Sequence, residues 1–186
     1  MRTSKEKSMK TTELVLIALM ATILCIVGPV TLPVGVVPVT TVTFVLYLLL
    51  YLIGTFRTFV GCLLYLCIGF VGLPVFSGYA AGPAVLFGPT GGYLIGYLLL
   101  IVCSGVFIER SRKKVAHFFG MLLGLLFCYL MGTVWLVWQT QLTWAQAFIT
   151  GVVPFLIFDI LKILIALWIG PVFRRHLRRA NLGIEK

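Results

Sequence analysis

Residues 91–114 read GGYLIGYLLLIVCSGVFIERSRKK, so a run of uncharged residues from 91 to 108 ends at a dense cluster of charges. About 20 predominantly apolar residues are enough to cross a bilayer as a helix, which satisfies its own backbone hydrogen bonds in lipid. Clustered Lys and Arg beside such a run mark its cytoplasmic end. This stretch therefore predicts a membrane-spanning helix over 91–108 whose C-terminal end faces the cytoplasm.

The composition extends this interpretation to the whole chain. The 186 residues are 61% hydrophobic and 11% charged, whereas soluble proteins carry about 25% charged residues. Spans of roughly 20 residues plus loops leave room for about six helices and for no ATPase, kinase or DNA-binding module. The net charge of +10 lies beside apolar runs and indicates topology signals and contacts with membrane lipid rather than nucleic acid. We expect one membrane-embedded, substrate-binding domain over residues 1–186.

The same pattern predicts an all-α integral membrane protein with six transmembrane helices. The other five spans are expected at about 12–27, 39–54, 59–71, 115–138 and 154–170. Threading them alternately places fourteen of the fifteen Lys and Arg residues on one side, which puts both termini in the cytoplasm.

The segments expected on the outer side are unusual connectors. The loops over 28–38 and 72–89 are uncharged and rich in Gly and Pro, which favours re-entrant or lid-like segments that line a cavity. Plain turns with lipid-facing apolar residues are the alternative. The segment 143–151, before the last span, is expected to form an outer lid.

The fifteenth cation, Lys162, lies inside the last span together with Asp159. A spacing of three places both side chains on one helix face. Ionisable groups inside a span cost about 2.5–3.5 kcal/mol each on insertion scales and usually mark functional sites. The pair therefore predicts a site for a polar solute, although it could also be a self-neutralising pair without a ligand.

Two motifs make the chain recognisable. Residues 72–76 (GLPVF), 82–84 (GPA) and 86–96 (LFGPTGGYLIG), together with 154–162 (PFLIFDILK), resemble the signatures of the BioY family. The resemblance implies the high-affinity, biotin-selective S component of an energy-coupling-factor (ECF) transporter, which captures biotin from the extracellular side of a bacterial plasma membrane. It also implies that a transmembrane coupling protein and two cytosolic ATPase subunits act with it. On this interpretation the chain is not an enzyme, and it needs no metal or cofactor because biotin is its cargo.

The chemistry of biotin suggests roles for the ion pair. Asp159 can accept an N–H of the ureido ring, and Lys162 can donate to the ureido carbonyl or pair with the carboxylate. The sequence leaves open which end of biotin Lys162 contacts.

The start of the fourth span supplies further candidates for the binding site. Gly91 and Gly92 would let the backbone approach the ligand, and Thr90 could donate a hydrogen bond. Tyr93 and Tyr79 could stack on the ligand or offer a hydroxyl, although tyrosines are also common at membrane interfaces.

The first span carries small residues at a spacing that allows close helix contact. Ala18 and Thr22 are four residues apart, and Ala21 is followed four residues later by a cysteine. First helices of these S components often carry an Ala-x-x-x-Ala patch for the coupling protein, so Ala18, Ala21 and Thr22 are docking candidates that depart from the family pattern.

Other functions remain open at this point. The nearest alternative is an S component for thiamine or riboflavin. A small membrane enzyme has little support, because the sequence shows no paired carboxylates and no nucleophile–base arrangement. A membrane assembly protein could use Asp159 and Lys162 for helix association.

Overall fold

The computed structural model describes residues 2–32 and 37–179. Its helices are α1 (Arg2–Val27), α2 (Val42–Ile53), α3 (Thr55–Val71), α4 (Pro83–Leu86), α5 (Gly91–Arg110), α6 (Lys114–Thr140), α7 (Trp144–Gly151) and α8 (Val153–Arg179). A short antiparallel pair of strands, β1 (Thr31–Leu32) and β2 (Val39–Thr40), links α1 to α2. The 3-10 turn η1 (Ser77–Tyr79) lies between α3 and α4.

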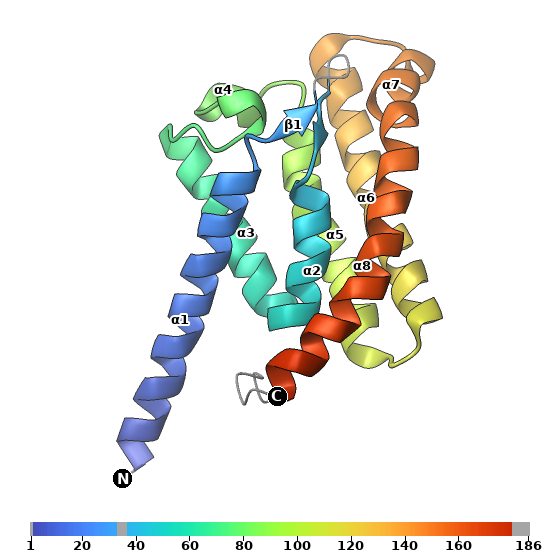
Figure 1. Cartoon of the computed structure of the whole chain (residues 1–186). Coiled ribbons are helices and arrows are strands. Elements are labelled where there is room, and N and C mark those ends of the chain that lie inside the picture. The colour runs from blue at the N-terminus through green and yellow to red at the C-terminus, as the bar shows by residue number, and fades with distance from the viewer. Residues whose placement is uncertain (1, 33–36, 180–186) are drawn as a thin grey trace.

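The six long helices run alternately up and down in one bundle (Figure 1). Both ends of the described chain lie at the lower end, together with the α2–α3 and α5–α6 turns. The strand pair, α4 and α7 cover the upper end. The described part of the chain is therefore almost entirely helical, and its irregular segments gather at the end opposite the termini.

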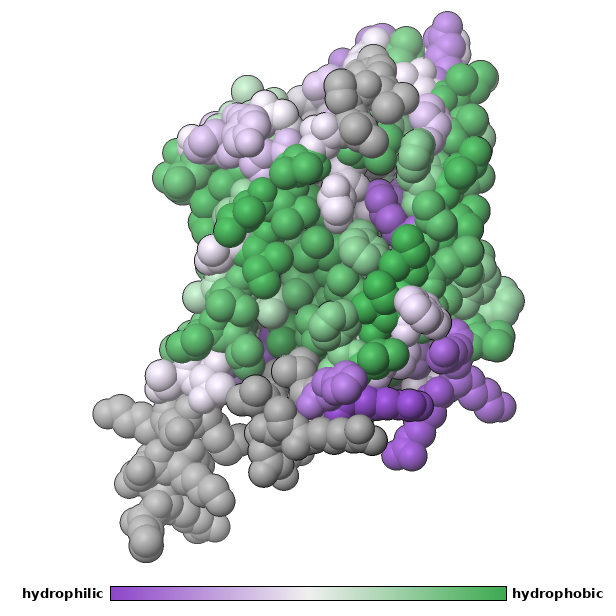
Figure 2. Space-filling view, in the orientation of Figure 1, coloured by the Kyte–Doolittle hydropathy of each residue, from purple (hydrophilic) through white to green (hydrophobic). Residues whose placement is uncertain are grey.

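A broad apolar band crosses the visible face of the bundle. Figure 2 shows hydrophobic side chains over most of the middle of the visible face and hydrophilic ones mainly at its upper and lower ends. Within the described residues, α5, α6 and α8 are long and apolar enough to cross a membrane, while the apolar helices over Thr11–Val27, Val42–Ile53 and Thr55–Val71 are shorter. The bundle is consistent with an integral membrane protein.

Two helix boundaries correct the sequence-based prediction. The second helix begins at Val42 rather than 39, because Val39 and Thr40 pair with β1 instead. The last helix continues through Pro171 to Arg179 instead of ending at 170. The break before α8 agrees with the expectation, since α7 is a separate helix over Trp144–Gly151.

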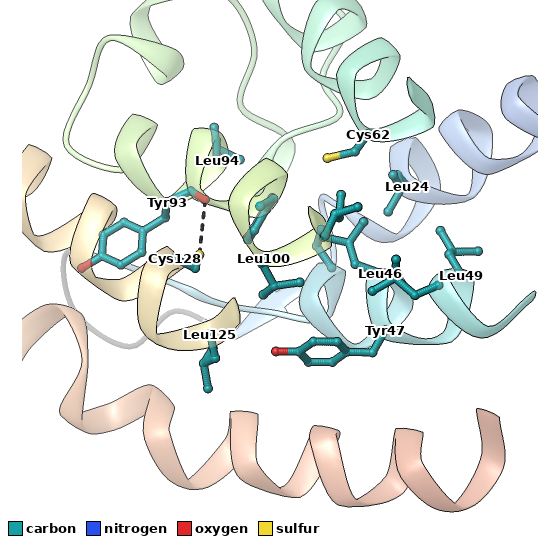
Figure 3. Packing of buried hydrophobic residues seen from close by; sticks show 14 of the residues in the cluster. Leu24, Leu46, Tyr47, Leu49, Cys62, Tyr93, Leu94, Leu100, Leu125 and Cys128 are labelled. Atoms are coloured by element: carbon teal, nitrogen blue, oxygen red, sulfur yellow. Dashed lines mark hydrogen bonds between the residues drawn. The ribbon is translucent and has the colours of Figure 1, made fainter. Parts of the chain in front are cut away.

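Glycines hold α5 and α6 unusually close together. A Cβ atom at Gly124 would lie 2.8 Å from the Leu100 carbonyl oxygen, and one at Gly96 would lie 3.1 Å from the Cys128 Cα. Small residues allow such close backbone approach between membrane helices. Figure 3 shows the upper part of this contact, where the Cys128 Sγ–H donates to the Tyr93 carbonyl oxygen over 3.7 Å. The closely packed α5–α6 pair thus forms one wall of the site described below.

Charged residues tie the helices together at the lower end. The Arg57 guanidinium donates to the Glu13 carboxylate over 2.6 Å and so links α3 to α1. The backbone N–H of Thr55 donates to the Glu109 carboxylate over 2.7 Å, which joins the start of α3 to the end of α5. The predicted basic side chains in segments 2–10 and 178–186 lie outside the side chains that the structure describes.

Candidate functional site

Asp159 is the centre of a buried polar network between three helices. Its side chain lies on α8, and the residue is only 4% exposed. Oδ1 accepts from the Lys162 ammonium over 2.6 Å and from the Thr43 hydroxyl of α2 over 3.1 Å. Oδ2 accepts from the Tyr129 hydroxyl of α6 over 2.6 Å. Hydrogen bonds to an ionised carboxylate are short and strong, so α2 and α6 hold this group in a fixed orientation.

Lys162 directs all of its hydrogen-bonding capacity toward the protein. Besides Asp159, its ammonium donates to the Thr40 carbonyl oxygen over 2.7 Å and to the Thr43 hydroxyl over 3.2 Å. An ammonium has three donors, and these three contacts use them all. Lys162 therefore fastens β2 and the start of α2 to α8, and it could bind a ligand directly only by giving up one of these bonds.

Some hydrogen-bonding capacity remains beside this network. Asp159 Oδ2 accepts from one donor among the described residues, and a carboxylate oxygen can accept two. The hydroxyls of Thr40 and Tyr97 lie 3.0 Å apart, and either can donate to the other. Whichever donates, one hydrogen of the pair is left over. The site thus offers an acceptor at Asp159 and a nearby donor at the Thr40–Tyr97 pair.

A cavity that is partly open to solvent lies against these groups. The cavity is lined by Val37, Pro38, Thr40, Thr43, Phe76, Ser77, Val85, Thr90, Tyr93, Leu94, Tyr97, Leu125, Cys128, Tyr129, Gly151, Phe155, Asp159 and Lys162. The lining is mainly apolar and aromatic, with a few polar groups that could fix the orientation of a ligand.

Four of the residues predicted from the sequence line this cavity: Asp159, Lys162, Thr90 and Tyr93. The Tyr93 hydroxyl donates to the Gly151 carbonyl oxygen over 3.1 Å, which connects α5 to the end of α7. Tyr93 therefore presents its ring to the cavity wall while its hydroxyl is bound to the protein.

The other three predicted residues lie elsewhere. Tyr79 is 71% exposed and is not part of the lining. A Cβ atom at Gly91 would overlap the Leu86 carbonyl of α4, and one at Gly92 would overlap Trp135 of α6. These two glycines are outside the lining as well, and their lack of a side chain permits close contact with α4 and α6.

The sequence-based reasoning missed the hydroxyls of Thr40, Thr43, Tyr97 and Tyr129. Threonine and tyrosine are frequent in membrane helices, so none of the four stands out alone. Thr40 and Thr43 do share the spacing of three that drew attention to Asp159 and Lys162. Their role depends on the packing of α2 against α8, which the sequence pattern does not specify.

The docking candidates on α1 separate into two groups. Ala21 is buried, and its backbone lies near Gly61 of α3. Ala18 and Thr22 are exposed on the surface of α1, and the Thr22 hydroxyl donates to the Ala18 carbonyl oxygen over 2.9 Å. Ala18 and Thr22 therefore form the accessible part of the predicted patch.

The fold and the site define a helical membrane protein with a mainly apolar cavity beside a buried carboxylate. A family model described as the BioY family matches residues 1–179. The chain belongs to the BioY family.

Relatives cover nearly the whole chain. Biotin transporter BioY2 of Lactococcus lactis is 37% identical over 169 residues, covering 90% of this chain and 93% of that protein. Biotin transporter BioY of Thermotoga maritima is 32% identical over 166 residues, covering 89% and 94%. A crystal structure of the S component for biotin from an ECF-type ABC transporter superposes with a TM-score of 0.79 at 26% identity, covering 91% of this chain and 92% of that one. These relationships place the chain among transport proteins rather than enzymes.

Proposed function

We propose that this protein is the S component of an ECF-type transporter and that it binds biotin with high affinity in the cavity beside Asp159. The relatives named as biotin transporters support this substrate. The observation that carries the proposal is a buried, oriented carboxylate with one acceptor position left, on the wall of a mainly apolar cavity.

The remaining hydrogen-bonding capacity suggests how the ureido ring is held. Asp159 Oδ2 accepts one ureido N–H, and the hydrogen left over in the Thr40–Tyr97 pair is donated to the ureido carbonyl. A cyclic urea carries these two groups side by side. In this arrangement Lys162 is a positioning residue that holds Asp159 in its orientation, because its own donors are committed to the protein.

We also propose that the six long helices all cross the membrane with both termini in the cytoplasm. The described basic residues at the lower end, such as Arg110 and Lys113, fit the excess of positive charge in cytoplasmic loops. The cavity is lined by Pro38, Ser77 and Gly151, which belong to segments at the opposite end. Biotin is then captured from the extracellular side, beneath α7 and the β1–β2 strand pair.

A binding panel tests the substrate. We expect the purified protein to bind radiolabelled biotin in a saturable, one-to-one manner, since the cavity presents the complement of a cyclic urea. Excess unlabelled biotin should displace the label, whereas equal concentrations of thiamine or riboflavin should not. Displacement by either of these vitamins instead of biotin would assign the protein to the other substrate.

We propose further that a transmembrane coupling protein and two cytosolic ATPase subunits deliver biotin inward. Family membership and the accessible small residues Ala18 and Thr22 support this. Close helix contact requires small side chains at such a surface.

A tryptophan substitution at the proposed docking surface tests whether that surface is needed for transport but not for biotin binding. The Ala18→Trp variant is expected to abolish biotin uptake by cells that contain the coupling module, while the purified variant binds biotin like the wild type. Leu19→Trp is the matched control, because Leu19 is exposed on a different face of the same helix. Normal uptake by Ala18→Trp would show that this surface does not dock.

A further inference from the structure

Ser77 has a hydroxyl that the protein leaves without a partner. Its Oγ atom is buried and makes no hydrogen bond among the described residues, although Ser77 lines the cavity. A buried hydroxyl without a partner costs about 1–3 kcal/mol, so native structures contain few of them. An apolar residue at this position would avoid that cost if the hydroxyl had no role.

The surrounding backbone holds Ser77 in place. The preceding residue, Phe76, is fully buried and packs edge-on against Tyr65 of α3. The following Gly78 donates its backbone N–H to the Pro29 carbonyl oxygen over 3.2 Å.

Gly78 and Tyr79 both have positive φ angles, of 66° and 63°. A left-handed conformation at a residue other than glycine is strained and is often retained at ligand-binding segments. The turn η1 thus fixes the backbone at Ser77, a residue that lines the cavity.

A second hydroxyl on the lining is also uncommitted. Thr90 occupies the N-cap position of α5, but its side chain makes no capping hydrogen bond. Residues at this position normally use their side-chain oxygen to cap the helix. The start of the 20-residue α5 also carries partial positive charge, which favours a nearby anion.

The polar groups around Asp159 are proposed to bind the ureido end of biotin and are not available to its carboxylate. Asp159 and the Thr40–Tyr97 pair provide the complement of the ureido ring, and among the described lining residues the one cation, Lys162, donates to three protein oxygens. The carboxylate of biotin is the remaining polar group of the ligand, and it is an acceptor without a cationic partner.

We infer that the Ser77 hydroxyl donates to the carboxylate of biotin and that Thr90 is its second hydroxyl donor. This inference rests on the proposed biotin binding. It assigns the carboxylate to uncharged groups of η1 and α5, and it separates that end of the ligand from Lys162.

The test compares two ligands across three proteins. Equilibrium binding of biotin and of biotin methyl ester is measured for the wild type, Ser77→Ala and Lys162→Met. Ser77→Ala should lower the affinity for biotin by about tenfold, the effect of losing one hydrogen bond to a charged group, and should lower the affinity for the neutral ester far less. Lys162→Met should weaken the binding of both ligands by the same factor, since its effect passes through Asp159 at the ureido end.

Two controls distinguish the loss of a ligand contact in Ser77→Ala from a folding defect: its thermal stability and the conservative variant Ser77→Thr. Without biotin, Ser77→Ala should be at least as thermally stable as the wild type, because the variant removes a buried hydroxyl without a partner. Ser77→Thr keeps the hydroxyl and should retain the preference for biotin over the ester. Equal biotin affinity of Ser77→Ala and the wild type would overturn the inference, and so would a selective loss of biotin over ester binding in Lys162→Met. If the wild type bound no biotin, the proposed function itself would fail.

Discussion

Replacing Asp159 with asparagine is expected to lower the affinity of the purified protein for biotin by about a hundredfold or more. Asparagine keeps the shape of the side chain but removes the charge that orients the Lys162, Thr43 and Tyr129 donors. Each hydrogen bond to a charged group contributes about 1.5–3 kcal/mol, and the substitution also offers an N–H donor where the ligand presents one. Equilibrium binding of radiolabelled biotin measures the effect.

Two further variants separate this effect from a loss of folding. Removing one partner of a buried ion pair can destabilise a protein by about 3–5 kcal/mol. The double variant Asp159→Asn/Lys162→Met removes both charges, so it should recover thermal stability and still fail to bind biotin. Glu13→Gln breaks the more exposed ion pair with Arg57 at the other end of the bundle and should bind normally. Wild-type affinity in Asp159→Asn would contradict the assignment of the site.

Replacing Gly124 with leucine is expected to prevent normal folding. A side chain here would meet the Leu100 backbone and the Ser104 hydroxyl at the centre of the α5–α6 contact. Overpacking a core typically costs about 1–3 kcal/mol, and the cost is expected at the upper end or beyond because the obstacle is a backbone. The cavity wall formed by Tyr97 and Tyr129 depends on this contact. Size-exclusion chromatography and thermal unfolding in detergent would show the loss of monodisperse, folded protein.

The matched control for the helix contact is Val134→Leu. Val134 lies on the same helix and is exposed at the surface of the bundle, so a larger apolar side chain there should leave folding and biotin binding unchanged. A Gly124→Leu protein with wild-type stability would show that α5 and α6 can separate at no cost.

The sequence predicted the elements whose signal is local. The uncharged stretch over 91–108 followed by five charged residues identified α5 nearly to its observed end. Gly151 and Pro154 indicated that the last apolar stretch is divided, and α7 and α8 are indeed separate helices. The predicted start of α2 was wrong because Thr40 pairs with Thr31, nine residues earlier in the chain. Helical periodicity carries no signal for such strand pairing.

Residues of the candidate site could be predicted from the sequence where their type is rare inside a membrane span. A carboxylate and an ammonium inside an apolar run stand out, so Asp159 and Lys162 could be named from the sequence. Ser77 and Tyr129 could not, because their importance comes from a missing partner and from a contact between α6 and α8. Gly91 and Gly92 were predicted to let the backbone approach a ligand; in the structure they lie outside the cavity lining, close to Leu86 and Trp135.

The most direct test of the central claim is an experimental structure of this protein crystallised with biotin. We expect density for one biotin molecule in the cavity, with a ureido N–H within hydrogen-bonding distance of Asp159 Oδ2 and the carboxylate at Ser77. A saturated complex with biotin bound elsewhere, and with this cavity free of it, would contradict the account.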